Sequence, residues 1–135
     1  MADLLVNIDV DDLEKAVAFY SSAIGLAPAR RFGAFAVEMV GGSAKIYLLA
    51  KPAHSNPLVS GPVKRSYARH WTPVHVDFVV DDIDAAAARA RAAGAKPEGQ
   101  IARNSWGNLA RFADPFGHGF CLIEFRNRGY DEIAT

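Results

Sequence analysis

Apolar and polar residues over the first fifty positions follow the pattern of a strand, a helix and three more strands. Residues 4–10 alternate between apolar and polar side chains, which predicts a half-buried strand. Apolar residues then recur at helical spacing over 13–24, after two aspartates suited to a helix cap and before Gly25, which suits a helix end. Three shorter strands are expected at 27–31, 34–40 and 45–50, the last two joined by a turn at Gly41-Gly42. This half predicts a βαβββ module over residues 1–50.

The same order of elements returns after an interruption. Residues 51–71 contain three prolines, a glycine and many small polar residues, so we expect a connecting loop there. A strand is predicted at 74–80, a helix at 83–93 ending at Gly94, and strands at 97–102, 108–113 and 119–125. Residues 72–126 therefore predict a second βαβββ module, followed by a tail at 127–135.

The two halves also resemble each other residue by residue. The segment VDDLE at 10–14 recurs as VDDID at 80–84, seventy positions later. Later strands match at an offset of seventy-four, where Gly33 aligns with Gly107, Ala36 with Ala110 and Leu48 with Leu122. An internal duplication within one domain is the simplest interpretation.

Composition excludes several classes of protein. The 135 residues suit a single domain with its own core, and 15 basic residues balance 15 acidic ones, which argues against a nucleic-acid-binding surface. Cys121 is the only cysteine, so no intrachain disulfide can form. The first residues lack the features of a secretion signal, and no apolar run is long enough to span a membrane. We expect a cytoplasmic protein with no membrane or nucleic-acid partner.

Two segments resemble the vicinal-oxygen-chelate (VOC) superfamily, which includes glyoxalase I, bleomycin-resistance proteins and extradiol dioxygenases. They are VDDLEKAVAFYSSAIGL, similar to the first strand-to-helix passage of that superfamily, and DPFGHGFCLIEF, similar to its final hairpin and strand. The resemblance covers nearly the whole chain. It implies an α+β fold in which two tandem βαβββ modules form a curved mixed sheet around a cavity, and it implies a homodimer.

The resemblance also places the metal-ligand positions of the superfamily. Metal-dependent members take four ligands, usually His and Glu, from equivalent inward-facing strand positions, and these positions correspond here to Leu5, Tyr47, His75 and Cys121. Leucine has no donor atom and tyrosine is normally protonated, so His75 and Cys121 alone remain as ordinary ligands. We therefore expect no metal and no other cofactor; a divalent metal held by His75 and Cys121 is the less favoured alternative.

Candidate ligand-binding residues follow from strand alternation and from the resemblance. Side chains two apart share a face, so Asn7 joins Leu5, and Asp77 joins His75 at roughly 7 Å along the strand, which we take as too far for a direct bond but within reach of a shared ligand. Trp71 and Trp106 precede strands expected to line the cavity, and Trp106-Gly107 resembles the bleomycin-resistance pattern. The ligand-binding set is Asn7, Tyr47, Trp71, His75, Trp106 and Cys121. All of these except Asn7 also have a plain structural interpretation, such as a core aromatic, a hydrogen-bonded wall histidine or a buried cysteine that acts as a small hydrophobe.

Three functions remain open on this evidence. The leading hypothesis is metal-independent binding or sequestration of a small, possibly antibiotic-like molecule in the cavity. The second is a lyase, isomerase or dioxygenase-type enzyme, similar to lactoylglutathione lyase, in which His75 assisted by Asp77 or Tyr47 transfers a proton. The third is a purely structural or partner-binding module whose cavity is filled by its own side chains. A basic and aromatic run at 63–71 suits either a clamp over an anionic or aromatic ligand or a solvated loop.

Overall fold

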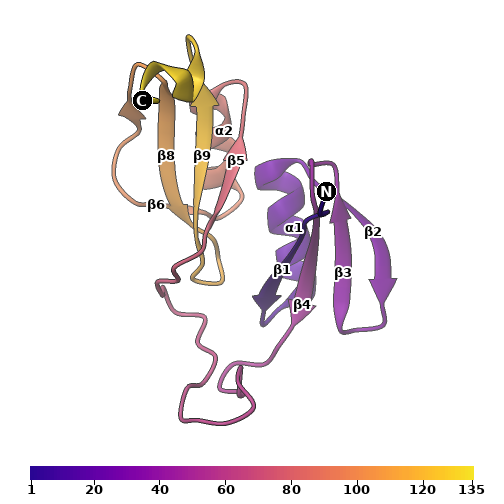
Figure 1. The fold of residues 1–135 in the computed structure, drawn as a ribbon. Coiled ribbons are helices and arrows are strands. Elements are labelled where there is room, and N and C mark those ends of the chain that lie inside the picture. Colours follow the sequence, from indigo (N-terminus) through magenta and orange to yellow (C-terminus); the bar gives the residue numbers. More distant parts are fainter. The chain divides into compact units, whose positions relative to one another are not determined.

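The computed structural model describes all 135 residues and divides them into two compact units, Met1–Ala68 and Arg69–Thr135. In each unit one α-helix packs against one face of a mixed β-sheet (Figure 1). This confirms the predicted α+β fold and the two βαβββ modules. Neither helix is long and apolar enough to cross a membrane.

The first unit follows the predicted element order closely. Its elements are β1 (Leu5–Val10), α1 (Leu13–Ile24), β2 (Ala27–Phe32), β3 (Ala36–Val40) and β4 (Lys45–Ala50). The strands lie in the order β1-β4-β3-β2, where β1 and β4 are parallel and the other pairs are antiparallel. The parallel pair is possible because α1 provides part of the long crossover that parallel neighbours need.

The second unit repeats this arrangement with its second strand broken into two pieces. Its elements are β5 (Val76–Val79), α2 (Ile83–Ala92), β6 (Lys96–Pro97), β7 (Ala102–Arg103), β8 (Gly107–Ala113), β9 (Gly119–Phe125) and the 3₁₀ helix η1 (Gly129–Glu132). The sheet has the order β5-β9-β8-β6, and β7 also pairs with β8. Strands β5 and β9 are parallel, like β1 and β4.

Three features of the second unit differ from the prediction. The strand expected at 97–102 is two short pieces, because the chain turns at Gly99, whose φ of +91° is a conformation that favours glycine. The strand expected from residue 74 begins at Val76. In the segment before it, the hydroxyl of Thr72 donates a hydrogen bond to the backbone carbonyl of Val74. The tail contains η1, which the sequence pattern did not predict.

The helices begin and end where capping chemistry requires. The carboxylate of Asp12 accepts a hydrogen bond from the backbone N–H of Lys15, and Gly25 ends α1 in the left-handed conformation. The buried face of α1 carries the apolar residues that the helical spacing predicted to be buried, Ala16, Phe19, Tyr20 and Ala23.

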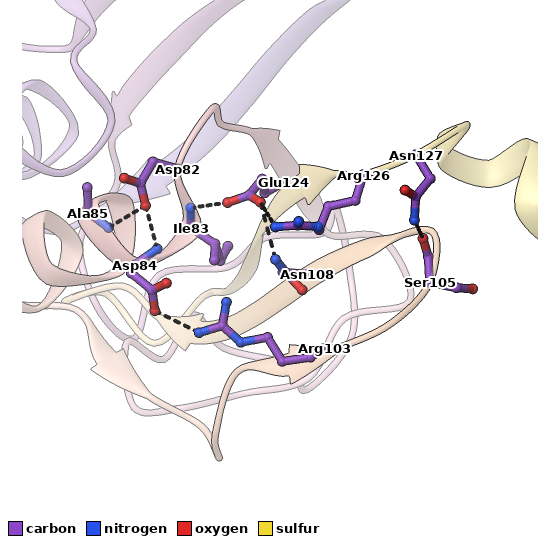
Figure 2. Close-up of polar contacts among 10 residues, drawn as sticks. All are labelled: Asp82, Ile83, Asp84, Ala85, Arg103, Ser105, Asn108, Glu124, Arg126 and Asn127. Carbon is purple, nitrogen blue, oxygen red and sulfur yellow. Dashed lines mark hydrogen bonds and ion pairs between the residues drawn. The ribbon is translucent and has the colours of Figure 1, made fainter.

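Two carboxylates hold the start of α2, as Figure 2 shows. Asp82 accepts hydrogen bonds from the backbone N–H groups of Asp84 and Ala85, each at 3.1 Å. Glu124 of β9 accepts one from the N–H of Ile83 at 2.7 Å and another from the Asn108 amide at 3.2 Å. These acidic groups are therefore used in joining α2 to its sheet.

Strand register supports the internal duplication and corrects one part of the alignment. Asn7 of β1 lies opposite Tyr47 of β4, and the duplicated positions Asp77 and Cys121 lie opposite each other in β5 and β9. In the strand on the other side of β4, which is β3, Glu38 lies opposite Tyr47. In the strand on the other side of β9, which is β8, Arg111 lies opposite Cys121. Glu38 and Arg111 are thus the equivalent pair, an offset of seventy-three, so the offset of seventy-four proposed for this strand is wrong by one residue.

Candidate functional site

In each unit the sheet face away from the helix carries the candidate polar residues. Along β4, Ile46 and Leu48 are buried, while Tyr47 between them is only half-buried and belongs to the other face. Asn7 shares that open face with Tyr47, and Asp77 shares the corresponding face of the second unit with Cys121. Strand alternation therefore places the candidate residues as predicted.

A pocket of about 160 Å³ lies on the open face of the second unit. It is lined by Arg69, Trp71, Thr72, His75, Glu98, Arg111, Gly119, Phe120 and Cys121. Three residues singled out from the sequence, Trp71, His75 and Cys121, therefore meet in one pocket. The indole of Trp71 is 81% exposed, so one wall of the pocket is a large aromatic surface open to solvent.

At one side of this pocket the Asp77 carboxylate lies between two other functional groups. Nε2 of His75 is 3.0 Å from Oδ1 of Asp77, so the prediction that these side chains are too far apart for a direct bond is wrong. The spacing of roughly 7 Å applies to backbone positions on one face of a strand, and the long imidazole side chain spans it. His75 also precedes the first paired residue of β5, so its backbone is not held in the sheet ladder.

The thiol of Cys121 completes this group. Burial, the negative charge of Asp77 and a hydrogen bond to Asp77 together raise the pKa of the thiol to about 11, and burial is the largest of these causes. The thiol is therefore a neutral hydrogen-bond donor near neutral pH. A reactive thiolate would need an environment with the opposite charge.

The donor atoms present do not fit the four-ligand metal centre of the superfamily. Leu5 is an exposed side chain without a donor atom, and the hydroxyl of Tyr47 donates to Oε2 of Glu38 at 2.8 Å, which raises the pKa of Tyr47. A different set, His75, Asp77 and Cys121, has donor atoms that all lie within 4.8 Å of one another. These three residues are the ones that could hold a metal here, after loss of the thiol proton. Asp77 was not assigned as a ligand from the sequence, although its place on the His75 face was the signal for it.

In the first unit, Tyr47 belongs to a polar cluster that the sequence did not predict. The guanidinium of Arg30 forms two hydrogen bonds with the Glu38 carboxylate, at 3.0 Å and 2.6 Å. These bonds and the Tyr47 hydroxyl lower the pKa of Glu38 to about 2, although burial acts in the opposite direction. The cluster could have been found from the sequence only with the register of β3 against β4 in hand.

Two arginines and a glutamate form the other side of the pocket, and sequence reasoning missed their roles. Arg69 holds both carboxylate oxygens of Glu98, at 2.7 Å and 2.9 Å, and this lowers the pKa of Glu98. Gly119 leaves room for that arginine, because a Cβ atom there would lie 2.7 Å from its Nη2 atom. Arg111 lines the same pocket, and its side chain forms no hydrogen bond or ion pair. Arg69 was noted only as part of a basic loop.

Trp106 and the candidates of the first unit do not line this pocket. Trp106 precedes β8 and packs against Tyr130 of η1 with ring centroids 5.2 Å apart. Its end of β8 lies opposite Phe125, whereas the pocket is built around the pairing of Arg111 with Cys121. Asn7 and Tyr47 lie together on the open face of the first unit.

Comparisons with known proteins agree with this architecture. A family described as a glyoxalase-like domain matches residues 5–123. A lactoylglutathione lyase from Agrobacterium tumefaciens has a similar structure, with a TM-score of 0.64, 21% identity and coverage of 91% of this chain and 92% of that one. No curated protein matches the sequence.

Two further solved structures share the fold. The fosfomycin resistance protein FosX from Listeria monocytogenes gives a TM-score of 0.70 at 16% identity, covering 93% of this chain and 94% of that one. TioX from Micromonospora sp. ML1 gives 0.68 at 18% identity, covering 93% and 100%. At such identities the likeness establishes the fold alone. Because the family match spans most of the sequence, the chain belongs to the glyoxalase-like domain family and has the fold of the vicinal-oxygen-chelate superfamily.

Proposed function

We propose that this protein binds a small organic molecule on the open face of its second unit, without a metal, and acts by holding it. The observation that carries the proposal is the pocket in which the exposed Trp71 indole meets the polar side chains of His75 and Arg111. An aromatic wall with a few polar groups is the usual composition of a small-molecule site. The exposed ring of Trp71 also offers a flat surface on which an aromatic ligand could stack.

Donor chemistry supports the metal-independent part of the proposal. Leu5 removes one of the four expected ligands, and Tyr47 is committed as a donor to Glu38. Of the three donors in the second unit, the Cys121 thiol is protonated near neutral pH. Similar structures include proteins named for fosfomycin and bleomycin resistance, which is compatible with a role in handling a small molecule.

A second candidate function, enzymatic proton transfer, is favoured by the contact between His75 and Asp77. With its Nε2–H directed at the carboxylate, the imidazole keeps the Nδ1 lone pair available to take a proton from a carbonyl or hydroxylated substrate. In this role Asp77 would orient the ring and stabilise its protonated form.

The test combines elemental analysis of the purified protein with a thermal-shift screen of planar organic molecules, with and without added nickel, zinc, manganese or iron. We expect stabilisation that needs no metal, about 2.7 kcal/mol for a ligand at one hundred times its Kd. The Trp71→Ala variant should lose it, and the control Trp106→Phe should keep it. A stoichiometric metal, or stabilisation that requires one, would overturn the proposal.

The two candidate functions differ in what happens to the ligand. If the protein only binds, the ligand is recovered unchanged after prolonged incubation, and His75→Ala lowers affinity at most. If the protein is an enzyme, the ligand is converted, and His75→Ala abolishes conversion while binding to Trp71 remains.

A further inference from the structure

We infer that the pocket of the second unit selects planar aromatic molecules carrying a single carboxylate, and that Arg111 binds that carboxylate. This inference rests on the proposed function, because it names the ligand class of the same pocket. The guanidinium of Arg111 is a cation to which the chain gives no hydrogen-bond or ion-pair partner.

Arg111 is one of the residues that line the pocket. It is an exposed residue of β8, it lies opposite Cys121 of β9, and its side chain is on the open face of the sheet. No carboxylate, hydroxyl or carbonyl oxygen of the chain accepts a hydrogen bond from its guanidinium. Residue 99 adds no covering side chain, since a Cβ built on Gly99 would lie 3.9 Å from Nη2 of Arg111.

Both carboxylates close to Arg111 already have other partners. Glu98 feels the charge of Arg111, but Arg69 holds its two oxygens in a bidentate pair. Asp77, one strand beyond Cys121, is contacted by His75 at 3.0 Å. A planar guanidinium presents paired N–H groups that match a carboxylate, so Arg111 keeps its strongest kind of interaction available for a ligand.

The internal duplication provides a comparison within the same chain. The position equivalent to Arg111 is Glu38, which has the opposite charge and the same place beside the central strand. Glu38 is fully satisfied, by Arg30 at 2.6 Å and by Tyr47 at 2.8 Å. In the second unit, by contrast, the charged residue at this position, Arg111, has no oppositely charged partner from the chain. A carboxylate from outside the chain would supply that partner.

The rest of the pocket limits the ligand further. Its lining has two guanidinium groups, of Arg69 and Arg111, and one carboxylate, of Glu98, which Arg69 holds, so Arg111 is the one lining charge without an ion-pair partner. A single carboxylate matches this one guanidinium, whereas the second charge of a doubly charged group would find no further unpaired cation in the lining. Trp71 and Phe120 line the same pocket, and their rings favour a flat aromatic body.

The experiment compares two probes of nearly the same size and shape, the charged naphthalene-2-carboxylate and the neutral naphthalene-2-carboxamide. Binding is followed by quenching of Trp71 fluorescence in a Trp106→Phe background, so that Trp71 is the one remaining tryptophan. We expect the carboxylate to bind at least tenfold more tightly than the amide, and added salt to reduce that difference. Arg111→Met should abolish the preference, and Arg111→Lys should keep part of it because a lysine is a point charge. The control Arg89→Met removes an exposed arginine of α2 and should change nothing.

The outcomes separate this inference from the proposed function. If both probes bind equally well, or if Arg111→Met keeps the preference while its thermal unfolding is unchanged, the pocket binds aromatic molecules but the role of Arg111 is wrong. If neither probe quenches Trp71 and the wider thermal-shift screen also finds no ligand, the proposed function fails, and this inference fails with it.

Discussion

The Cys121 thiol shows how burial and one neighbouring carboxylate decide the chemistry available in the pocket. Burial and the Asp77 carboxylate raise its pKa to about 11, from an ordinary value of 9.0. We therefore predict slow reaction with a disulfide reagent at pH 7 and a rate that keeps rising up to about pH 11. The unfolded chain loses this proton first, so native stability should fall as the pH rises from 9 to 11. Rates measured across this range, together with urea unfolding at each pH, check both statements.

The Asp77→Asn variant is the matched test of the cause. It keeps the size of the side chain and removes the charge, so the labelling profile of Cys121 should move to lower pH. A profile that is centred near the ordinary value in the wild type, or that does not move in the variant, would contradict the contact between these residues. The raised pKa also means that a metal at His75, Asp77 and Cys121 must displace the thiol proton, which makes its affinity rise with pH.

For single residues, the sequence predicted which side chains lie in the pocket better than it predicted the contacts that they make there. Trp71, His75 and Cys121 could be assigned to one cavity from the superfamily resemblance, the internal duplication and their places on or before the strands. Arg111 could not, because its face depends on the register of β8 against β9, and the duplication offset for that strand was wrong by one residue. A shift of one residue turns a side chain to the opposite face.

Among the elements, the β8–β9 pair depends on a glycine at its far end. A Cβ atom at Gly107 would lie 2.5 Å from the backbone oxygen of Glu124 and 3.2 Å from the Cα of Phe125, and backbone cannot move aside easily. We predict that Gly107→Ala lowers the free energy of unfolding by about 1 to 3 kcal/mol and the Tm by about 4 to 10 °C. Calorimetry or urea unfolding measures this loss.

Gly119→Ala is the control for that prediction. Its Cβ atom would meet the end of the flexible Arg69 side chain at 2.7 Å, which can swing away at little cost in stability. A loss equal to that of Gly107→Ala would show that crowding at the β8–β9 backbone is not the cause.

Secondary structure was most predictable where local chemistry alone determines it. The bounds of α1 were predicted correctly because helical spacing, the Asp12 cap and Gly25 agree. The strand at 97–102 was wrong because apolar spacing carries no information about the turn at Gly99. The paired strands β6 and β7 exist through hydrogen bonds to β8, which is a tertiary effect.

For the whole molecule, the open sheet faces pose the remaining question. Leu5 of β1 is 57% exposed and Val79 of β5 is 66% exposed, each on the open face of its own sheet. Apolar groups placed in this way favour association, and the superfamily resemblance leads us to expect a homodimer. Sequence patterns within one chain cannot specify the partner surface, because the same alternation serves a face covered by its own chain or by a second copy.

We predict that sedimentation equilibrium of the wild type gives twice the chain mass of 14.6 kDa. Leu5→Glu and Val79→Glu place a charge on parts of the open faces that do not line the pocket and that should be covered in the dimer, so each should shift the protein toward the monomer at micromolar concentration. Val59→Glu is the control, because this fully exposed residue lies in the connecting loop. A monomeric wild type would refute the dimer. Leu5→Glu or Val79→Glu could instead lower the Tm and leave the mass doubled. That face would then be covered within the subunit and contribute to its fold, and other residues would form the dimer contact.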